Sequence, residues 1–172
     1  MKASEIGEDQ LIQEAADLIA ADVAVGLLDP AQGSTTVGAV TDRGVFETLL
    51  MFSPDGDLVI PLSPESGLVA LEVTPNEGGL ASLGTLLDKK VLPTKTPIVS
   101  TAGEEKSYLF FRFDGPRTKP CVTLGAGLEL IADGFVVAPP RHAPGTEGQW
   151  KQGYHPADMP VTDLPAKFAA LL

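Results

Sequence analysis

The stretch SGLVALEVT at residues 66–74 has the pattern of a buried central strand. An apolar run follows a Ser-Pro-Glu-Ser-Gly turn and stops before Pro75, and short apolar runs bounded by turn residues are typical of strands covered on both faces. Polar residues near the end of this stretch are Glu72 and Thr74. Because residues two apart in a strand project from one face, these two side chains are expected to share a face.

Helical and strand-like segments lie on both sides of this strand. Helices are expected where apolar residues recur at helical spacing, with Asp9 as the first N-cap: residues 9–21, 43–52 and 77–90, with a short helix after Pro165. Further strands are expected at residues 23–29, 57–62, 97–101, 107–113, 121–124, 128–132 and 134–140. The pattern predicts an α/β or α+β fold with a central mixed or antiparallel sheet flanked by helices. At 172 residues, positions 1–172 are expected to form a single domain.

The N-terminal residues, the lengths of the apolar runs and the cysteine content indicate where the protein is located. Acidic and polar residues follow Lys2 where a signal peptide needs an apolar region, and no apolar run is long enough for a membrane span, so a soluble, cytoplasmic protein is expected. Cys121 is the only cysteine, which excludes an internal disulfide. Its neighbours Val122 and Leu124 suggest a thiol in the core.

The net charge of -11 disfavours a free-standing DNA-binding protein, because non-specific affinity for DNA comes largely from Lys and Arg. Arg112, Arg117, Lys119 and Arg141 come near one another in sequence and could line a local basic groove. Scattered cations of this kind are more often solvated surface.

Several segments, taken in order, resemble one known family. They are SGLVALEV, the leucine-rich segment 77–90, LPTKTPIVSTAG, SYLFFR, GLELIADGFVVAPP and LPAKFAALL. Together they resemble the N-terminal domain of bifunctional primase-polymerases, the prim-pol branch of the archaeo-eukaryotic primase superfamily. The most specific piece is GFVVAPPRH at 134–142, followed by Gln149-Trp150. The resemblance covers nearly the whole chain and implies a prim-pol-like fold.

The resemblance also implies a metal site. Family members carry an Asp-x-Asp or Asp-x-Glu pair on the strand that matches residues 66–73, and this pair binds Mg²⁺ or Mn²⁺ for nucleotidyl transfer. Here the pair is Glu72 and Thr74, so a neutral side chain replaces one carboxylate. Glu129 takes the position of the third family carboxylate. The implied catalytic residues and metal ligands are therefore Glu72 and Glu129.

Nucleotide contacts are implied for Tyr108, Arg112 and His142. Tyr108 stands where the family has a phosphate-binding histidine, Arg112 matches a family arginine, and His142 matches a histidine after the Ala-Pro-Pro turn. Where family members often have a glycine-rich turn, Glu104 and Glu105 would repel a triphosphate.

Several aromatic residues and His155 have both a functional and a structural interpretation. Trp150 and Tyr154 could stack on a base, although covering one end of the sheet is the simpler interpretation. Phe111 and Phe113 share a strand face and are expected in the core. His155 has no partner with metal-ligand spacing.

Three functions remain open from the sequence. The first is a prim-pol-like protein of DNA replication with weak or lost nucleotidyltransferase activity, which binds a nucleotide, DNA weakly, or a replication protein, and no membrane. The second is an active DNA primase/polymerase that uses Mg²⁺ or Mn²⁺ on Glu72 and Glu129. The third is an acidic protein-interaction module for a basic partner. Signatures of α/β-hydrolases, P-loops and dinucleotide-binding folds are absent from the sequence.

Overall fold

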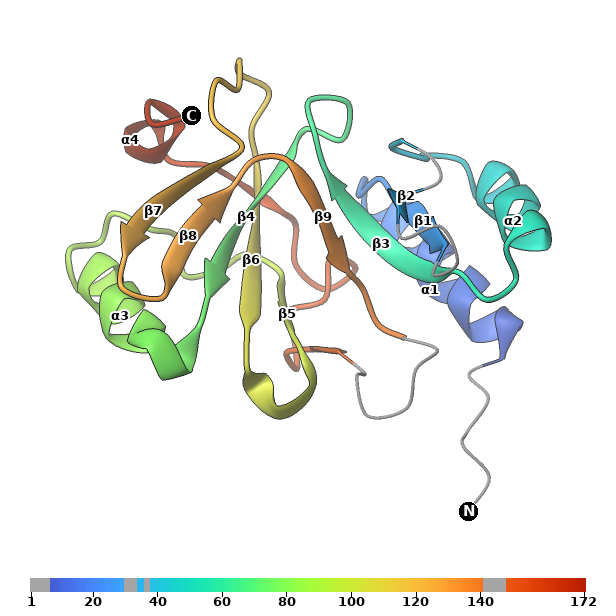
Figure 1. Ribbon diagram of the computed structural model, residues 1–172, viewed down its shortest axis with the longest axis horizontal. Helices are drawn as coiled ribbons and strands as arrows, with labels where there is room; N and C mark the ends of the chain where they lie inside the picture. Colours follow the sequence, from blue (N-terminus) through green and yellow to red (C-terminus); the bar gives the residue numbers. More distant parts are fainter. Residues whose placement is uncertain (1–6, 30–33, 36–37, 141–147) are drawn as a thin grey trace.

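The computed structural model describes residues 7–29, 34–35, 38–140 and 148–172 (Figure 1). The helices are α1 (Glu8–Ala20), α2 (Arg43–Phe52), α3 (Gly79–Asp88) and α4 (Ala166–Ala169), with short 3₁₀ turns η1 (Pro75–Glu77) and η2 (Ala102–Glu104). The larger sheet has the order β10 (Gln149–Trp150), β5 (Ile98–Ser100), β6 (Ser107–Arg112), β4 (Leu68–Val73), β8 (Leu128–Ile131) and β7 (Cys121–Gly125), and β11 (Thr162–Asp163) pairs with β6. The smaller sheet has the order β2 (Ser34–Thr35), β1 (Gly26–Asp29), β3 (Asp57–Leu62) and β9 (Gly134–Val137).

The sheets are antiparallel except for the parallel pairing of β11 with β6. This arrangement confirms the predicted α+β class. The sequence pattern did not show that β1, β3 and β9 leave the main sheet to form a second one.

Strand β4 is the centre of the larger sheet, as its apolar sequence predicted. All six of its residues are buried, and it pairs with β6 on one side and β8 on the other. Because side chains alternate across a strand, β4 contributes to two separate cores. Leu68 and Ala70 belong to the first core, and Val69, Leu71 and Val73 belong to the second.

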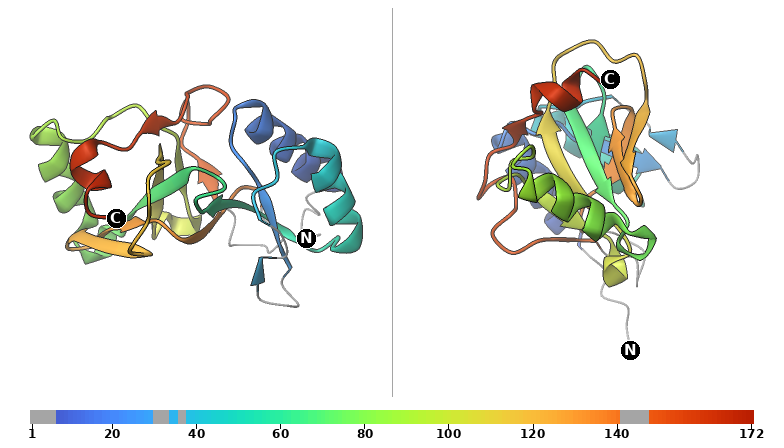
Figure 2. Two further views of the ribbon diagram at one scale, coloured as in Figure 1. Left: turned by 90° about the horizontal axis from the view of Figure 1, so that it is seen from above. Right: turned by 90° about the vertical axis from the view of Figure 1, so that its left-hand side faces the viewer.

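The two cores lie on opposite faces of the larger sheet. The first is shared with α1, α2 and the smaller sheet, through residues such as Leu11, Phe46 and Ile60. The second is covered by α3 and α4, where Phe168 is buried. Figures 1 and 2 show α1 and α2 beside the smaller sheet and α3 and α4 at the opposite end of the molecule.

The predicted helices are confirmed, with differences at their ends. The prediction of Asp9 as N-cap is wrong, because α1 begins at Glu8 and Gly7 occupies the cap position without a side-chain bond. Asp42 does cap α2, since its Oδ1 accepts from Val45 N over 3.0 Å. The third helix starts only at Gly79, because Gly78 has a left-handed backbone (φ 88°) that separates it from η1.

The aromatic residues of β6 and the following loop lie in or against the two cores. Phe111 is buried in the second core and Phe113 packs against it, as predicted. Among the described residues, no helix combines the length and the apolar character needed to cross a membrane.

Candidate functional site

A row of side chains crosses the larger sheet at the level of Glu72. Strand register places Glu72 directly opposite Tyr108 of β6 on one side and Glu129 of β8 on the other. Directly opposed residues of antiparallel strands project from the same face, with Cβ atoms about 4.5–5.5 Å apart. The structure therefore brings together three of the residues that the sequence singled out.

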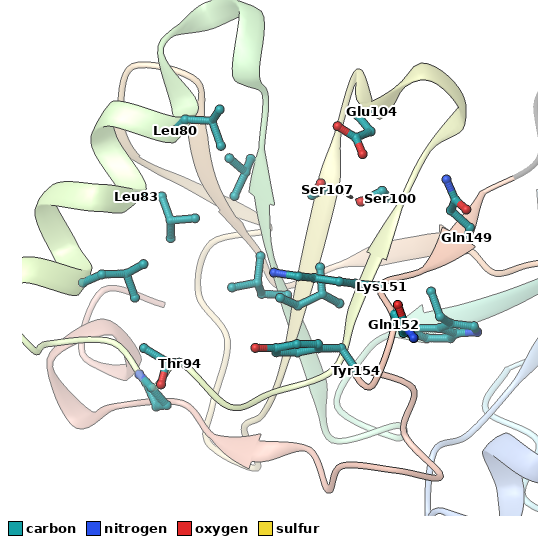
Figure 3. A pocket seen from close by; sticks show the side chains of 16 residues that line it. Leu80, Leu83, Thr94, Ser100, Glu104, Ser107, Gln149, Lys151, Gln152 and Tyr154 are labelled. Atoms are coloured by element: carbon teal, nitrogen blue, oxygen red, sulfur yellow. Dashed lines mark hydrogen bonds between the residues drawn. The ribbon is translucent and has the colours of Figure 1, made fainter.

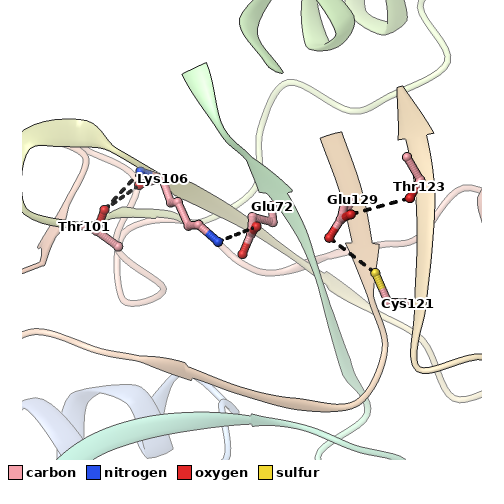
Figure 4. Close-up of polar contacts among 6 residues, drawn as sticks. All are labelled: Glu72, Thr101, Lys106, Cys121, Thr123 and Glu129. Carbon is pink, nitrogen blue, oxygen red and sulfur yellow. Dashed lines mark hydrogen bonds and ion pairs between the residues drawn. The ribbon is translucent and has the colours of Figure 1, made fainter. Parts of the chain in front are cut away.

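Glu72 is a nearly buried carboxylate at the end of an otherwise apolar strand. Its side chain is 11% exposed, and its Oε1 atom lies 2.8 Å from Nζ of Lys106 (Figure 4). A buried carboxylate needs a charged or hydrogen-bonding partner to offset its desolvation. Lys106 provides both, and its pKa is raised, first by the hydrogen bond to Glu72.

The backbone of Lys106 is held at the base of the β5–β6 hairpin. Its N–H donates to Oγ1 of Thr101 over 3.0 Å, and its carbonyl accepts from Thr101 N over 2.9 Å. Figure 4 shows the lysine side chain running from this turn to the Glu72 carboxylate. These bonds fix the backbone from which the lysine side chain extends. Lys106 is not among the residues that the sequence singled out; the available signal was its position two residues before Tyr108, the strand partner of Glu72.

Glu129 lies on the other side of Glu72 and faces strand β7. Cys121 Sγ and Thr123 Oγ1 each lie 3.5 Å from a Glu129 carboxylate oxygen, so both are long contacts (Figure 4). Partial burial, together with the negative charge of Glu129, raises the pKa of the Cys121 thiol. A raised pKa keeps this thiol protonated and unreactive.

The expectation that Cys121 is a core thiol is wrong. Cys121 is exposed on β7, which lies at the edge of the larger sheet. Its neighbours Val122 and Leu124 do pack against the second core. Because alternate residues face opposite sides, this packing turns Cys121 toward Glu129.

Tyr108 borders Glu72 from the opposite side. Burial, and then its interaction with the Glu72 carboxylate, raises the pKa of Tyr108 well above its ordinary value. The phenol therefore stays neutral and can donate a hydrogen bond but supplies no positive charge.

Glu72, Lys106 and Glu129 line a cavity of about 370 Å³. Its wall consists of Glu72, Thr74, Glu77, Lys106, Thr123, Gly125, Ala126, Gly127 and Glu129. Thr74 is thus beside Glu72, as strand alternation predicted. Three carboxylates and one ammonium group give the cavity a negative balance of charge.

Close backbone packing holds the floor of this cavity. Thr74 N donates to Gly127 O over 2.8 Å, and Gly79 N donates to Thr74 O over 3.0 Å. A Cβ atom on Gly79 would lie 2.4 Å from Gly127 O, so no other residue fits there without movement. Glycine at this position lets α3 begin directly against β4 and β8.

The structure does not bring Arg112 to the cavity. Its Nη2 donates to the Asp22 carbonyl over 2.9 Å and lies 3.0 Å from Asp22 Oδ2, at the end of α1. Arg112 stands opposite Leu68, at the other end of β6 from Tyr108. His142 and Arg141 lie outside the described residues, so their predicted roles stay predictions.

The suggested basic groove loses a second member, because Arg117 faces backbone carbonyls. Its Nη1 donates to Leu68 O over 2.9 Å and to Ala132 O over 2.7 Å, and its Nη2 donates to Phe113 O over 3.0 Å. Partial burial lowers the pKa of this guanidinium group, but it remains charged. Arg117 fastens the ends of β4 and β8.

A larger cavity of about 590 Å³ lies on the opposite face of the sheet. Lys151 and Tyr154 point into it from the segment after β10, toward Leu80 and Leu83 of α3 (Figure 3). Lys151 Nζ lies 4.7 Å from the centre of the Tyr154 ring, which occupies one face of this aromatic group. Tyr154 stays a candidate for stacking on a base.

Trp150 is held by protein contacts. Its Nε1 donates to Glu14 Oε1 over 2.7 Å, and its ring lies 6.0 Å from that of Phe110. These contacts support the interpretation that Trp150 covers one end of the sheet. His155 Nε2 lies 3.0 Å from the same Glu14 oxygen.

The fold and the cavity around Glu72 define a class of protein. Its members are α+β domains with carboxylates gathered on one face of an antiparallel sheet. The chain belongs to the family described as bifunctional DNA primase/polymerase, N-terminal, whose sequence model matches residues 25–166. A comparison with curated proteins finds no match. Family membership relates the chain to nucleotidyl transfer in DNA priming and polymerisation.

Enzymes of this family use divalent metal ions, but the described side chains do not fit one. Within the described residues, no three His, Cys, Asp or Glu side chains gather so that they could hold a metal ion. One oxygen of Glu72 is bound to Lys106, and Thr74 offers no charge. The residues implied as ligands, Glu72 and Glu129, are adjacent, but an ammonium group already neutralises one of them.

Proposed function

We propose that this chain is a prim-pol relative associated with DNA replication in which nucleotidyl transfer is weak or lost. The observation that carries the proposal is the 2.8 Å ion pair of Lys106 with Glu72, next to the neutral Thr74. Nucleotidyl transfer of this kind depends on metal ions held by paired carboxylates. With one carboxylate paired to lysine and its neighbour replaced, the cavity lacks such a pair.

The surroundings of the cavity support the same conclusion for triphosphates. Tyr108 is neutral where a cationic side chain would bind phosphate, and Arg112 is paired with Asp22. The net charge of -11 adds a general repulsion. We propose that what remains is weak binding of a nucleotide or DNA, or binding of a replication protein, and that Tyr108 and His142 would contact the nucleotide.

Primer extension tests the loss of activity. The wild-type chain, Glu72→Gln and Thr74→Asp are incubated with a primed template, labelled deoxynucleotides and Mn²⁺. We expect the wild type to incorporate no more label than Glu72→Gln. Metal-dependent incorporation by the wild type that Glu72→Gln abolishes would instead identify an active primase/polymerase using Glu72 and Glu129. Incorporation by Thr74→Asp alone would identify a polymerase site that lost one ligand.

Calorimetry at low salt separates the binding functions. Deoxynucleotides and single-stranded DNA are each titrated into the wild type and into Tyr108→Phe. Binding that Tyr108→Phe weakens supports a residual nucleotide site beside Glu72, on the face that Tyr108 borders. If neither ligand binds, the acidic surface serves a protein partner with a basic face, and the nucleotide part of the proposal is wrong.

A further inference from the structure

We propose that Lys106 is the resident cation of the acidic cavity and that it keeps divalent metal ions away from Glu72 and Glu129. This inference concerns the same cavity as the proposed function but does not depend on it. Metal exclusion can hold whether or not the chain binds a nucleotide or a partner.

The first support is the position of the ammonium group among the carboxylates. Lys106 Nζ donates to Glu72 Oε1 over 2.8 Å. The carboxylates of Glu77 and Glu129 line the same cavity as this ammonium group. One lysine therefore serves as counter-charge for three glutamates.

The second support is the strand register. Glu72 and Glu129 stand directly opposite each other on β4 and β8. Like charges in this arrangement destabilise a sheet unless a cation lies nearby. In metal-dependent sites a divalent ion supplies that charge, and here a side chain of the same chain does.

The third support is that the backbone of Lys106 is held in place independently of its contact with Glu72. Thr101 fixes its backbone in both directions, through donor and acceptor bonds of 2.9 and 3.0 Å. Glu72 lies on the most buried strand of the sheet. Because both ends are fixed, the pair loses less conformational freedom on forming than two mobile surface side chains would.

A divalent ion would have to displace this ammonium group or bind beside it. Displacement breaks the ion pair between Lys106 and Glu72. A divalent ion bound beside the ammonium group would be repelled by its positive charge at short range. Mg²⁺ and Mn²⁺ also need several oxygen ligands, and one Glu72 oxygen is already bound. Both routes weaken metal binding.

The test measures Mn²⁺ binding directly, by the electron paramagnetic resonance signal of free Mn²⁺. The variants are Lys106→Met, Glu129→Gln, the double variant Lys106→Met with Glu129→Gln, and Lys95→Met. Lys95 is exposed and outside the acidic cavity, so Lys95→Met changes the net charge equally. We expect Lys106→Met to bind Mn²⁺ about tenfold more tightly than the wild type. Lys95→Met should match the wild type, and Glu129→Gln should cancel the gain.

Two results would overturn the proposal. One is a gain in Lys106→Met no larger than in Lys95→Met. The other is wild-type Mn²⁺ binding that Glu129→Gln weakens tenfold, a measurement that needs no change at Lys106. Circular dichroism checks that each variant folds, and Lys106→Gln replaces Lys106→Met if the latter does not. Because no nucleotide is present, wild-type metal binding without primer extension would refute this proposal alone.

Discussion

Trp150 and Glu14 are 136 residues apart in sequence, yet a 2.7 Å hydrogen bond joins the indole to the carboxylate. Glu14 lies on α1 and Trp150 on β10, so the bond ties the first helix to the edge of the larger sheet. His155 shares the same carboxylate oxygen at 3.0 Å. One glutamate therefore serves two ring nitrogens from the C-terminal part of the chain.

Replacing Glu14 tests the strength of this connection. Glu14→Ala should lower the free energy of unfolding by about 1–3 kcal/mol, because the Trp150 N–H loses its acceptor. Urea unfolding followed by circular dichroism measures the change. Glu14→Gln keeps an acceptor oxygen and should lose less, and Gln10→Ala, at an exposed site on the same helix, should lose little. Equal stability of Glu14→Ala and the wild type would contradict the prediction.

Replacing Arg117 should lower the stability of the protein and leave its affinity for nucleic acid unchanged. Its guanidinium group donates to three carbonyls where the pairing of β4 with β8 ends. Arg117→Ala leaves these carbonyls without their donor, so the free energy of unfolding should fall by about 2 kcal/mol or more. Lys119→Ala, at an exposed neighbour, is the control. A basic groove would give the reverse result, with DNA affinity reduced and the unfolding midpoint unchanged.

Alkaline pH should destabilise the protein through the Glu72 cluster. The pKa values of Tyr108 and Lys106 are both raised in the folded state. The folded protein therefore holds these protons where the unfolded chain has lost them, and its stability falls as pH rises above about 10. Urea unfolding between pH 8 and pH 11 measures this fall. Tyr108→Phe should make it less steep. An equal effect of Tyr154→Phe, the chain's other tyrosine, would contradict the assignment to Tyr108.

Two glycines of the same helix should respond to alanine in opposite directions. Gly79→Ala places a Cβ atom 2.4 Å from Gly127 O and 2.7 Å from Thr74 O, so stability should fall by about 1–3 kcal/mol. Gly84 has no atom within 4 Å of its Cβ position. Gly84→Ala should therefore raise stability by about 0.5–1 kcal/mol, the difference in helix propensity. Thermal melts compare both variants with the wild type, and a neutral Gly79→Ala would show that α3 can shift away from β8.

The parts of the site that follow from local pattern could be predicted from sequence. Glu72 and Thr74 share a cavity because alternation along a strand is a local property, and the family resemblance brought in Glu129. The Lys106–Glu72 pair joins residues 34 positions apart and depends on which residues of β6 stand opposite β4. Apolar periodicity does not determine that register.

The environments of Cys121, Arg112 and Arg117 differ from those predicted because they depend on contacts between distant segments. The apolar neighbours of Cys121 suggested burial, but whether a strand lies at a sheet edge depends on pairing between distant segments. Arg112 and Arg117 looked like solvent-facing cations, yet both bind carbonyl oxygens of other elements. Backbone acceptors leave no mark in the sequence, so such arginines cannot be told apart from surface ones by composition.

Residues on both sides of the family match pack into the cores or bond to the rest of the chain. The family match begins at residue 25, whereas Leu11, Ala15 and Leu18 of α1 are fully buried in the first core. At the other end, the carbonyl of Leu172 accepts bonds from Thr118 and Lys119, beyond residue 166. A fragment trimmed to the family boundaries would lose one wall of each core and expose apolar surface prone to aggregation. Fragments for biochemical work should therefore include α1 and α4.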